Sequence, residues 1–298
     1  MNVIGDDQLG LLREALEEVS RNFTGLVLGN QGPHFSAGAN LLLLTTQIQE
    51  QDWDEIDRLI RRFQEATSGL RRFEKPVVAA CHDYTLGGGC EMAMGCDHVV
   101  LAAETYMGLP EFGVGLIPAG QGTKEMLLRC TETVPRTEDA DYYPGVKFAW
   151  ETLGWAKVST SAHEALKYRY TRPGESTVVM NKDWLIGEAK ARVLQLASSG
   201  YRPMPPRADL PAIGQTGLAM FKCLLFQMRR AGRISEHDEK IATKLAYVLC
   251  GGDLSWTHFV SEQYILDLER EAFVSLCGEP KTLERIQHTL KTGKPLRN

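Results

Sequence analysis

The stretch PVVAACHDYTLGGGCEMAMGCDHVVLAA, residues 76–103, decides the fold class. It opens with a short apolar run (76–80), passes through three glycines into a helical segment, and closes with a second apolar run (98–103). Such runs are typical of buried strands, and strands joined by helical crossovers pair in parallel. We therefore expect an α/β fold with a parallel sheet rather than a β-sandwich.

The preceding residues extend the same alternation. Residues 7–19 and 41–72 place apolar side chains at helical intervals, and GLVLGN (25–30) has the length of a buried strand. The stretch 131–146 is acidic and punctuated by proline, which predicts a surface loop.

The last third of the chain has a different composition. Residues 201–216 contain four prolines and predict a linker. Beyond it, 217–250 and 261–292 are helical in pattern, with helices beginning near Ser235 and Ser261. We expect a core over 1–200, a linker over 201–216 and a helical C-terminal region over 217–298.

The composition and net charge of the chain argue against nucleic acid and anionic membranes as partners. The 298 residues carry a net charge of -5, are 43% hydrophobic and 24% charged, and so fit an ordinary globular protein without a basic field for nucleic acid or anionic membrane. The basic residues of 58–75 are interleaved with acidic ones, which favours a solvated helix face. The seven cysteines form no CxxC pair and predict buried thiols in a reducing compartment. Without a transmembrane run or signal peptide, the expected location is cytoplasmic.

Two turns that contain glycine and other small residues could present backbone amides to a ligand. HFSAGAN (34–40) follows a strand and precedes a helical run, although a tight turn with Asn40 as N-cap explains it better in isolation. TLGGGCEMAMGCD (85–97) leads three glycines into a helix, where the dipole favours negative charge. A turn with Glu91 in a capping box, three residues after Gly88, explains that segment equally well.

Other candidate sites are weaker. Glu111 lies in a Gly- and Pro-rich loop, where a lone glutamate is usually solvated. Ser235, His237 and Asp238 are too close in sequence for a catalytic triad, so we expect helix capping. GLIPAGQGTK (115–124) resembles a phosphate loop only superficially, because GK[ST] is absent, and NAD or ATP sites are unsupported. The histidines show no ligand spacing, so we expect no metal.

The combination of two amide-presenting turns and two glutamates resembles the crotonase (enoyl-CoA hydratase/isomerase) superfamily. FSAGAN (35–40) and LGGGCEMAMGCD (86–97) are similar to its two oxyanion loops, and LPEFGVGLIPAGQGT (109–123) to its second catalytic segment. The closing stretch resembles the hydratase part of bacterial multifunctional 3-hydroxyacyl-CoA dehydrogenases. The resemblance implies a spiral of strand-strand-helix units with a helical C-terminal region, and a trimer or hexamer.

The resemblance also implies roles for individual residues. The amides of Ala39 and Gly88 would hold a thioester oxygen, Glu91 would activate water, and Glu111 would exchange a proton at C2. The reaction would be reversible syn hydration of a trans-2-enoyl-CoA in fatty-acid β-oxidation, with acyl-CoA as substrate and no bound cofactor. The expected substrate-binding residues are Phe35, Ala37, Gly38, Gly87, Pro110 and Gly115.

The chain departs from the family pattern at several positions. Asn40 stands where many relatives have Asp, Leu42 where Lys is frequent, and Gln121 where a glycine is usual. The family's first strands are missing, so we expect a portion of a longer protein, or an altered start, with a possible 3-hydroxyacyl-CoA dehydrogenase domain or subunit as partner. Two alternatives stay open: a Δ3-Δ2 enoyl-CoA isomerase, and a non-catalytic or RNA-binding module that uses the basic stretch 58–75.

Overall fold

The computed structural model describes residues 2–298, which form two compact units. Unit 1 contains the residues up to Asn40, Arg61–Leu109 and Val158–Pro206, and unit 2 contains Leu41–Ile60, Pro110–Lys157 and Arg207–Asn298. Each unit thus combines stretches that are distant in sequence. This grouping differs from the core, linker and C-terminal region expected from the sequence, and those boundaries stay predictions.

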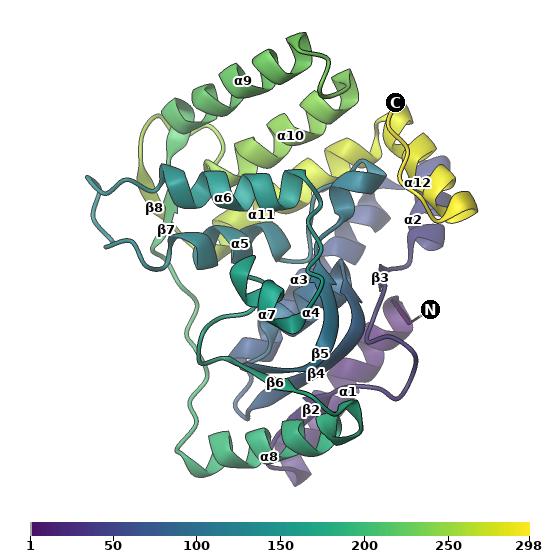
Figure 1. Cartoon of the computed structure of the whole chain (residues 1–298), viewed down its shortest axis with the longest axis vertical. Helices are drawn as coiled ribbons and strands as arrows, with labels where there is room; N and C mark the ends of the chain where they lie inside the picture. Colours follow the sequence, from purple (N-terminus) through teal and green to yellow (C-terminus); the bar gives the residue numbers. More distant parts are fainter. Residues whose placement is uncertain (1) are drawn as a thin grey trace. The chain divides into compact units, whose positions relative to one another are not determined.

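Unit 1 is built on a four-stranded sheet with the order β2-β4-β5-β6 (Figure 1). Its strands are β2 (Leu26–Leu28), β4 (Val77–Leu86), β5 (His98–Gly108) and β6 (Ser176–Val179). All three strand pairs are parallel, which confirms the expected sheet type.

One face of this sheet is covered by α8 (Leu185–Ser198). Val78 and Ala80 of β4 and Val100 of β5 pack there against apolar residues of that helix. The apolar runs are therefore core, as the sequence predicts. Helix α8 itself, together with η2 (Lys182–Trp184), was not among the expected elements.

A bulge interrupts the pairing of β4 with β5. The register with β5 shifts between Cys81 and Asp83, and Asp83 has a left-handed φ of 49°. Beyond this bulge, β4 also bonds with the loop around Ser36. A small parallel pair, β1 (Val3–Ile4) with β3 (Gly38–Ala39), completes this end of the unit.

The remaining helices of unit 1 include α1 (Asp6–Asn22), α4 (Gly88–Gly95), α7 (Ala162–Lys167) and the later part of α3 (Trp53–Arg72). Lys75 lies just beyond α3, and its Nζ donates to the carbonyls of Val19, Ser20 and Phe23 at the end of α1, at 2.8, 2.7 and 2.6 Å. A cation bound to a helix C-terminus is an internal cap. The expectation of a solvated basic face over 58–75 is therefore wrong for Lys75.

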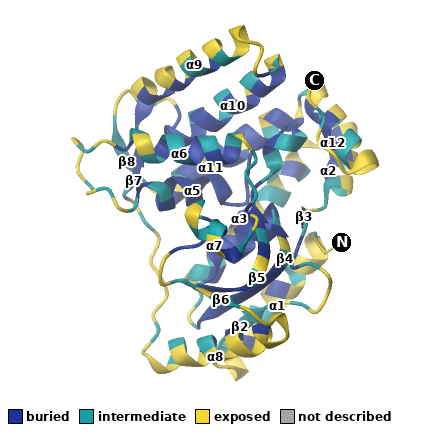
Figure 2. Ribbon diagram, in the orientation of Figure 1, coloured by how far each residue is buried: buried dark blue, intermediate teal, exposed yellow. Residues whose placement is uncertain are grey.

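Unit 2 is mainly helical. It holds α2 (Leu41–Glu50), η1 (Glu111–Val114), α5 (Gly122–Thr131), α6 (Tyr143–Gly154), α9 (Gly214–Arg230), α10 (Glu236–Leu249), α11 (Glu262–Cys277) and α12 (Pro280–Thr292). An antiparallel pair, β7 (Leu210–Ala212) with β8 (His258–Val260), belongs to the same unit. Helix α5 is buried almost throughout, whereas α9 exposes much of its surface (Figure 2).

The two helix starts predicted for unit 2 are confirmed. Ser235 and Ser261 are N-caps whose side chains accept hydrogen bonds from the amides of Asp238 and Tyr264. The Ser235 cap includes the reciprocal bond from Asp238, which is the capping role expected in place of a triad. The predicted surface loop 131–146 is irregular only up to the start of α6 at Tyr143, where helix begins inside the expected range.

Five of the seven cysteines are buried, Cys130 is half-buried and Cys223 is exposed, so the expectation of buried thiols is wrong for Cys223.

Within residues 2–298, no helix combines the length and the apolar character that crossing a bilayer requires.

Candidate active site

The first glycine-rich turn runs alongside the end of β4. The amide of Phe35 donates to the carbonyl of His82 at 3.1 Å, and the amide of Ser36 donates to Tyr84 at 3.0 Å. In return, Leu86 donates to the carbonyl of Ser36 at 3.0 Å. These bonds extend the sheet by one irregular strand, so the turn containing Gly38 and the turn after Leu86 meet at the same sheet edge.

The glycines at this meeting point are required by close packing. A methyl group added to Gly38 would lie 3.3 Å from the nitrogen of Gly88, and one added to Gly88 would lie 3.4 Å from the nitrogen of Ala39. At Gly89 it would lie only 2.5 Å from Cβ of Ser36. Gly38 also has a φ of 96°, which residues with a Cβ rarely adopt. The backbones of both turns can approach only because these side chains are absent.

This approach brings two backbone amides together at the start of α4. Gly88 is the first residue of the helix, where amides have no intrahelical acceptor and the helix dipole is positive. The amides flanking Ala39 are used internally, because Gly38 donates to Oγ of Ser36 at 3.1 Å and Asn40 donates to the carbonyl of Ile4 at 3.1 Å. Paired amides at a helix N-terminus are suited to bind an anion or a polarised carbonyl oxygen.

Glu91 lies in the first turn of the same helix. Glu91 is 3% exposed, and all eight residues of α4 are buried. The helix is capped at Gly87, so the third helical residue is Cys90 and not Glu91. The capping-box alternative is therefore wrong by one position. A carboxylate buried in an otherwise apolar helix is a candidate acid or base.

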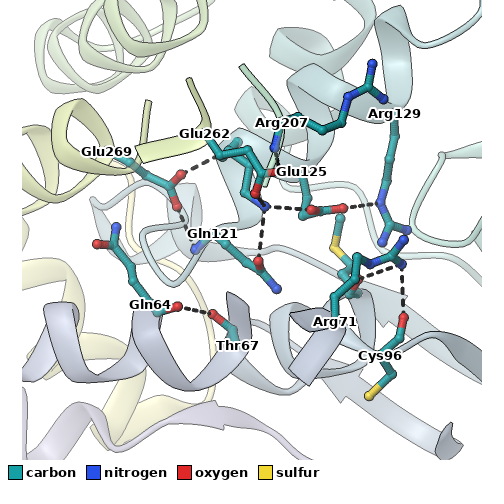
Figure 3. Close-up of polar contacts among 12 residues, drawn as sticks. Gln64, Thr67, Arg71, Cys96, Gln121, Glu125, Arg129, Arg207, Glu262 and Glu269 are labelled. Atoms are coloured by element: carbon teal, nitrogen blue, oxygen red, sulfur yellow. Dashed lines mark hydrogen bonds and ion pairs between the residues drawn. The ribbon is translucent and has the colours of Figure 1, made fainter. Parts of the chain in front are cut away.

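The opposite end of α4 is held by Arg71 of α3 (Figure 3). Its guanidinium donates to the carbonyl of Cys96 at 3.0 Å and pairs with Glu175 at 3.0 Å. Arg71 is thus a second exception to the expected solvated basic face. Burial raises the pKa of the neighbouring Asp97 to about 6, against the lowering effect of its bonds with Val77 and Tyr201. The positive charge of Arg71 at this C-terminal end stabilises the helix that presents Gly88.

Glu111 belongs to unit 2. It is half-buried and opens the short helix η1, which follows Pro110 and is capped at its C-terminus by Gly115. Gly115 has a φ of 86°, and the amide of Leu116 donates back to the carbonyl of Glu111 at 3.1 Å. The expectation of a simply solvated loop glutamate is not met, because Glu111 is half-buried and its Oε2 atom is buried.

The expected site residues thus separate by unit. Unit 1 holds the amides of Ala39 and Gly88, the carboxylate of Glu91, and the further residues Phe35, Ala37, Gly38 and Gly87, whereas unit 2 holds Pro110, Glu111 and Gly115. Within unit 1, the structure brings Gly38 and Ala39 against Gly88.

Sequence reasoning missed two supports of the amide pair. Ser36 accepts the Gly38 amide and packs on Gly89, and the ring of Phe63 lies over Gly88, 2.9 Å from a methyl group built there. A serine two residues before a glycine is a recognisable local turn signal. Phe63 gives no such signal, since its contact joins distant parts of the chain.

Comparisons with known proteins identify relatives of this chain. Residues 1–134 match the family described as Enoyl-CoA hydratase/isomerase. A Bacillus subtilis protein named "Probable 3-hydroxyacyl-CoA dehydrogenase" is 42% identical over 297 residues, which is 100% of this chain and 37% of that protein. Another Bacillus subtilis protein, named "Probable enoyl-CoA hydratase", is 33% identical over 109 residues, 37% of this chain and 41% of the relative. The chain therefore spans 37% of the length of the first relative, and its alignment covers 41% of the second.

Among solved structures, a carnitinyl-CoA dehydratase from Mycobacterium thermoresistibile superposes with a TM-score of 0.66 at 14% identity, covering 98% of this chain and 84% of the other. At this identity the likeness concerns the fold alone. It confirms the expected crotonase-type α/β fold with a helical C-terminal region. Residues 1–134 thus match the enoyl-CoA hydratase/isomerase family, and the chain as a whole has the fold of a crotonase module.

Proposed function

We propose that the chain catalyses reversible hydration of a trans-2-enoyl-CoA to the 3-hydroxyacyl-CoA, a step of fatty-acid β-oxidation. The observation that carries this proposal is the close approach of Ala39 and Gly88 at the start of α4, with the buried Glu91 one turn further along.

The amides of Ala39 and Gly88 would bind the thioester oxygen of the substrate. As water adds at C3, the electrons of the double bond move toward C2 and the carbonyl, so the oxygen gains negative charge. Amides held rigidly by the surrounding glycine contacts stabilise that charge more than they stabilise the neutral thioester. Loss of one such donor typically costs about 3 kcal/mol of transition-state stabilisation.

The two glutamates would divide the proton transfers. Glu91 accepts a proton from the water whose oxygen bonds to C3, and Glu111 delivers a proton to C2. In the reverse direction the same groups exchange roles. Glu111 starts as the neutral acid, and after the reaction Glu91 releases its proton to solvent while Glu111 regains one. The net change is the addition of one water molecule, so the reaction requires no redox cofactor.

The names of longer relatives suggest a context for this activity. A protein named 3-hydroxyacyl-CoA dehydrogenase and others named trifunctional enzymes align with this chain over only 36% to 37% of their length. We propose that a dehydrogenase domain or subunit consumes the 3-hydroxyacyl-CoA. A trimeric or hexameric assembly and a cytoplasmic location also remain predictions.

The experiment is a spectrophotometric hydration assay with crotonyl-CoA and a long-chain enoyl-CoA. Glu91→Gln and Glu111→Gln should each lower kcat by about 100-fold or more, the usual contribution of a general acid or base. Glu104→Gln, on an exposed part of β5, is the matched control and should retain activity. Full activity in both site variants would refute the assignment.

The same variants address the alternatives. Hydration that survives Glu91→Gln, together with Δ3-Δ2 isomerisation that requires Glu111, would favour an isomerase. RNA binding that weakens with salt and is lost on changing Arg61 and Arg62 would favour a nucleic-acid-binding module.

A further inference from the structure

The segment between Glu111 and α5 is irregular yet buried. Leu116, Ile117, Ala119 and Gln121 are between 0% and 3% exposed. Irregular backbone is usually found on the surface, because its amides and carbonyls need partners. The shape of the segment 115–121 therefore depends on the groups that supply those partners.

At the first end, α12 supplies a partner. The hydroxyl of Thr282 donates to the carbonyl of Gly115 at 3.0 Å, and Nε2 of His237 lies 2.9 Å from the same hydroxyl oxygen. Because the single hydroxyl proton is given to Gly115, the histidine must be the donor in the second bond. A methyl group added to Gly115 would lie 2.9 Å from Oγ1 of Thr282, so the contact is tight.

At the other end, α11 supplies a carboxylate. Glu269 is fully buried, and its two oxygens accept the amides of Gln121 at 2.9 Å and Lys124 at 3.0 Å (Figure 3). Gln121 has a left-handed φ of 101°, which is unfavourable for a residue with a side chain. The carboxylate therefore satisfies amides at the start of α5 and fixes the turn that residue 121 would otherwise resist.

A buried ion network surrounds this contact. The Nζ of Lys124, whose side chain is 2% exposed, lies 2.7 Å from Glu125, 3.2 Å from Glu262 and 3.2 Å from the side-chain oxygen of Gln121. Glu262 lies two helical turns before Glu269 on α11, and its carboxylate bonds with the Lys124 side chain. It also accepts the amide of Arg207 at 2.9 Å.

We propose that Glu269 is a positioning residue for Glu111: by holding Gln121 in its left-handed turn, it fixes the backbone of 111–121 from which the Glu111 side chain projects. This inference rests on the proposed catalytic role of Glu111.

The test compares three variants of the full chain in the crotonyl-CoA assay. Glu269→Gln replaces one acceptor oxygen with an amide group that cannot accept, so kcat should fall about 10- to 100-fold while KM stays within about threefold, as expected for misplacement of a reacting group. Adding Gln121→Gly should restore most of kcat, because glycine adopts the turn without assistance. Glu262→Gln, the matched control, also removes a buried charge and should retain kcat.

Two further measurements keep the result decisive. If Glu269→Gln does not fold, Glu269→Asp keeps the charge with a shorter reach and should lose less kcat, with the same rescue by Gln121→Gly. Hydrogen exchange of a peptide covering 109–124 should be faster in the Glu269 variant, return toward wild type with Gln121→Gly, and stay slow in Glu262→Gln.

The outcomes separate the two proposals. A wild-type chain without hydratase activity, but with this exchange pattern, would refute the proposed function and leave the positioning contact standing. Unchanged exchange in Glu269→Gln, equal kcat losses in the Glu262 and Glu269 variants, or no rescue by Gln121→Gly would overturn the positioning role.

Discussion

Helices α4 and α5 begin in similar ways and are used differently. Both follow glycine-containing turns, and neither is capped by the side chain of its own N-cap residue. At α5, the amides of Gln121 and Lys124 bind the carboxylate of Glu269. At α4, the first residue Gly88 lies instead against the backbone of Ala39.

The negative charge at a helix start can come from the same chain or from a bound molecule. The stretch 115–124 superficially resembles a phosphate loop, and its helix does bind an anionic group, but that group is a carboxylate of the same chain. The start of α4 is built from glycines that admit no side chain, which suits a charge brought by substrate.

The largest expected effect concerns the charges around α5. Lys124→Met should lower the free energy of unfolding by about 3 kcal/mol, since it removes the cation beside the carboxylate of Glu262 and leaves the buried Glu125 paired with Arg129 alone. Urea denaturation measures the loss. In the double variant with Glu262→Gln part of the stability should return, and a loss below about 1 kcal/mol in the single variant would mean that the network is not needed.

The next effect concerns packing at α4. Gly89→Ala places a methyl group 2.5 Å from Cβ of Ser36 and should separate the two turns, so hydration should fall by about 100-fold, the scale of losing one oxyanion donor. Gly69→Ala is the control: it lies in α3 with nothing within 4 Å of the added methyl group and should leave activity intact. Equal activity in both variants would contradict the role of the glycine triplet.

The two units should also respond differently to acid. Burial lowers the pKa of His237 in unit 2 to about 4, so the unfolded chain binds its proton first and stability falls as pH drops from about 6.5 to 4. In unit 1, burial lowers the pKa of His98 to about 4 and raises that of Asp97 to about 6. Acidification therefore disfavours folding through His98 and favours it through Asp97, and the two largely cancel.

His237→Gln is the corresponding test. Between pH 7 and 4.5 it should remove about 2 kcal/mol of pH dependence from urea denaturation, given 1.36 kcal/mol for each unit of pKa difference. An unchanged pH profile would show that His237 is not the group that titrates.

The smallest expected effect is at the far end of α4. Arg71→Gln removes the cation that binds the carbonyl of Cys96 and should cost about 1 kcal/mol of unfolding free energy. Arg58→Gln, on the exposed part of the same α3, should change little. Thermal melts of both variants provide the comparison, and equal melting temperatures would contradict the capping role.

Short sequence patterns predicted several elements of the fold correctly. The apolar runs 76–80 and 98–103 are the neighbouring parallel strands β4 and β5, and Ser235 and Ser261 cap the predicted helices. These features depend on residues close in sequence. The four-residue strand β6 and the cover of the sheet by α8 were not foreseen, because they depend on pairing over some 75 residues or more.

The candidate site divides in the same way. Glycine spacing predicted two amide-bearing turns, but only packing shows that Gly89 rests on Ser36. Gln121 was noticed as a departure from glycine, yet its partner Glu269 lies 148 residues away and leaves no local signal. The role of a buried carboxylate depends on which groups from distant parts of the chain lie next to it in the folded protein.

We propose that the amides at the start of α4 polarise the carbonyl of a thioester. Infrared spectroscopy of crotonyl-CoA, isotope-labelled at the carbonyl and bound to the Glu91→Gln, Glu111→Gln double variant, tests it directly. We predict a carbonyl stretch at lower frequency than in free crotonyl-CoA, with the shift lost on adding Gly89→Ala. Bound crotonyl-CoA with an unshifted carbonyl would contradict the claim.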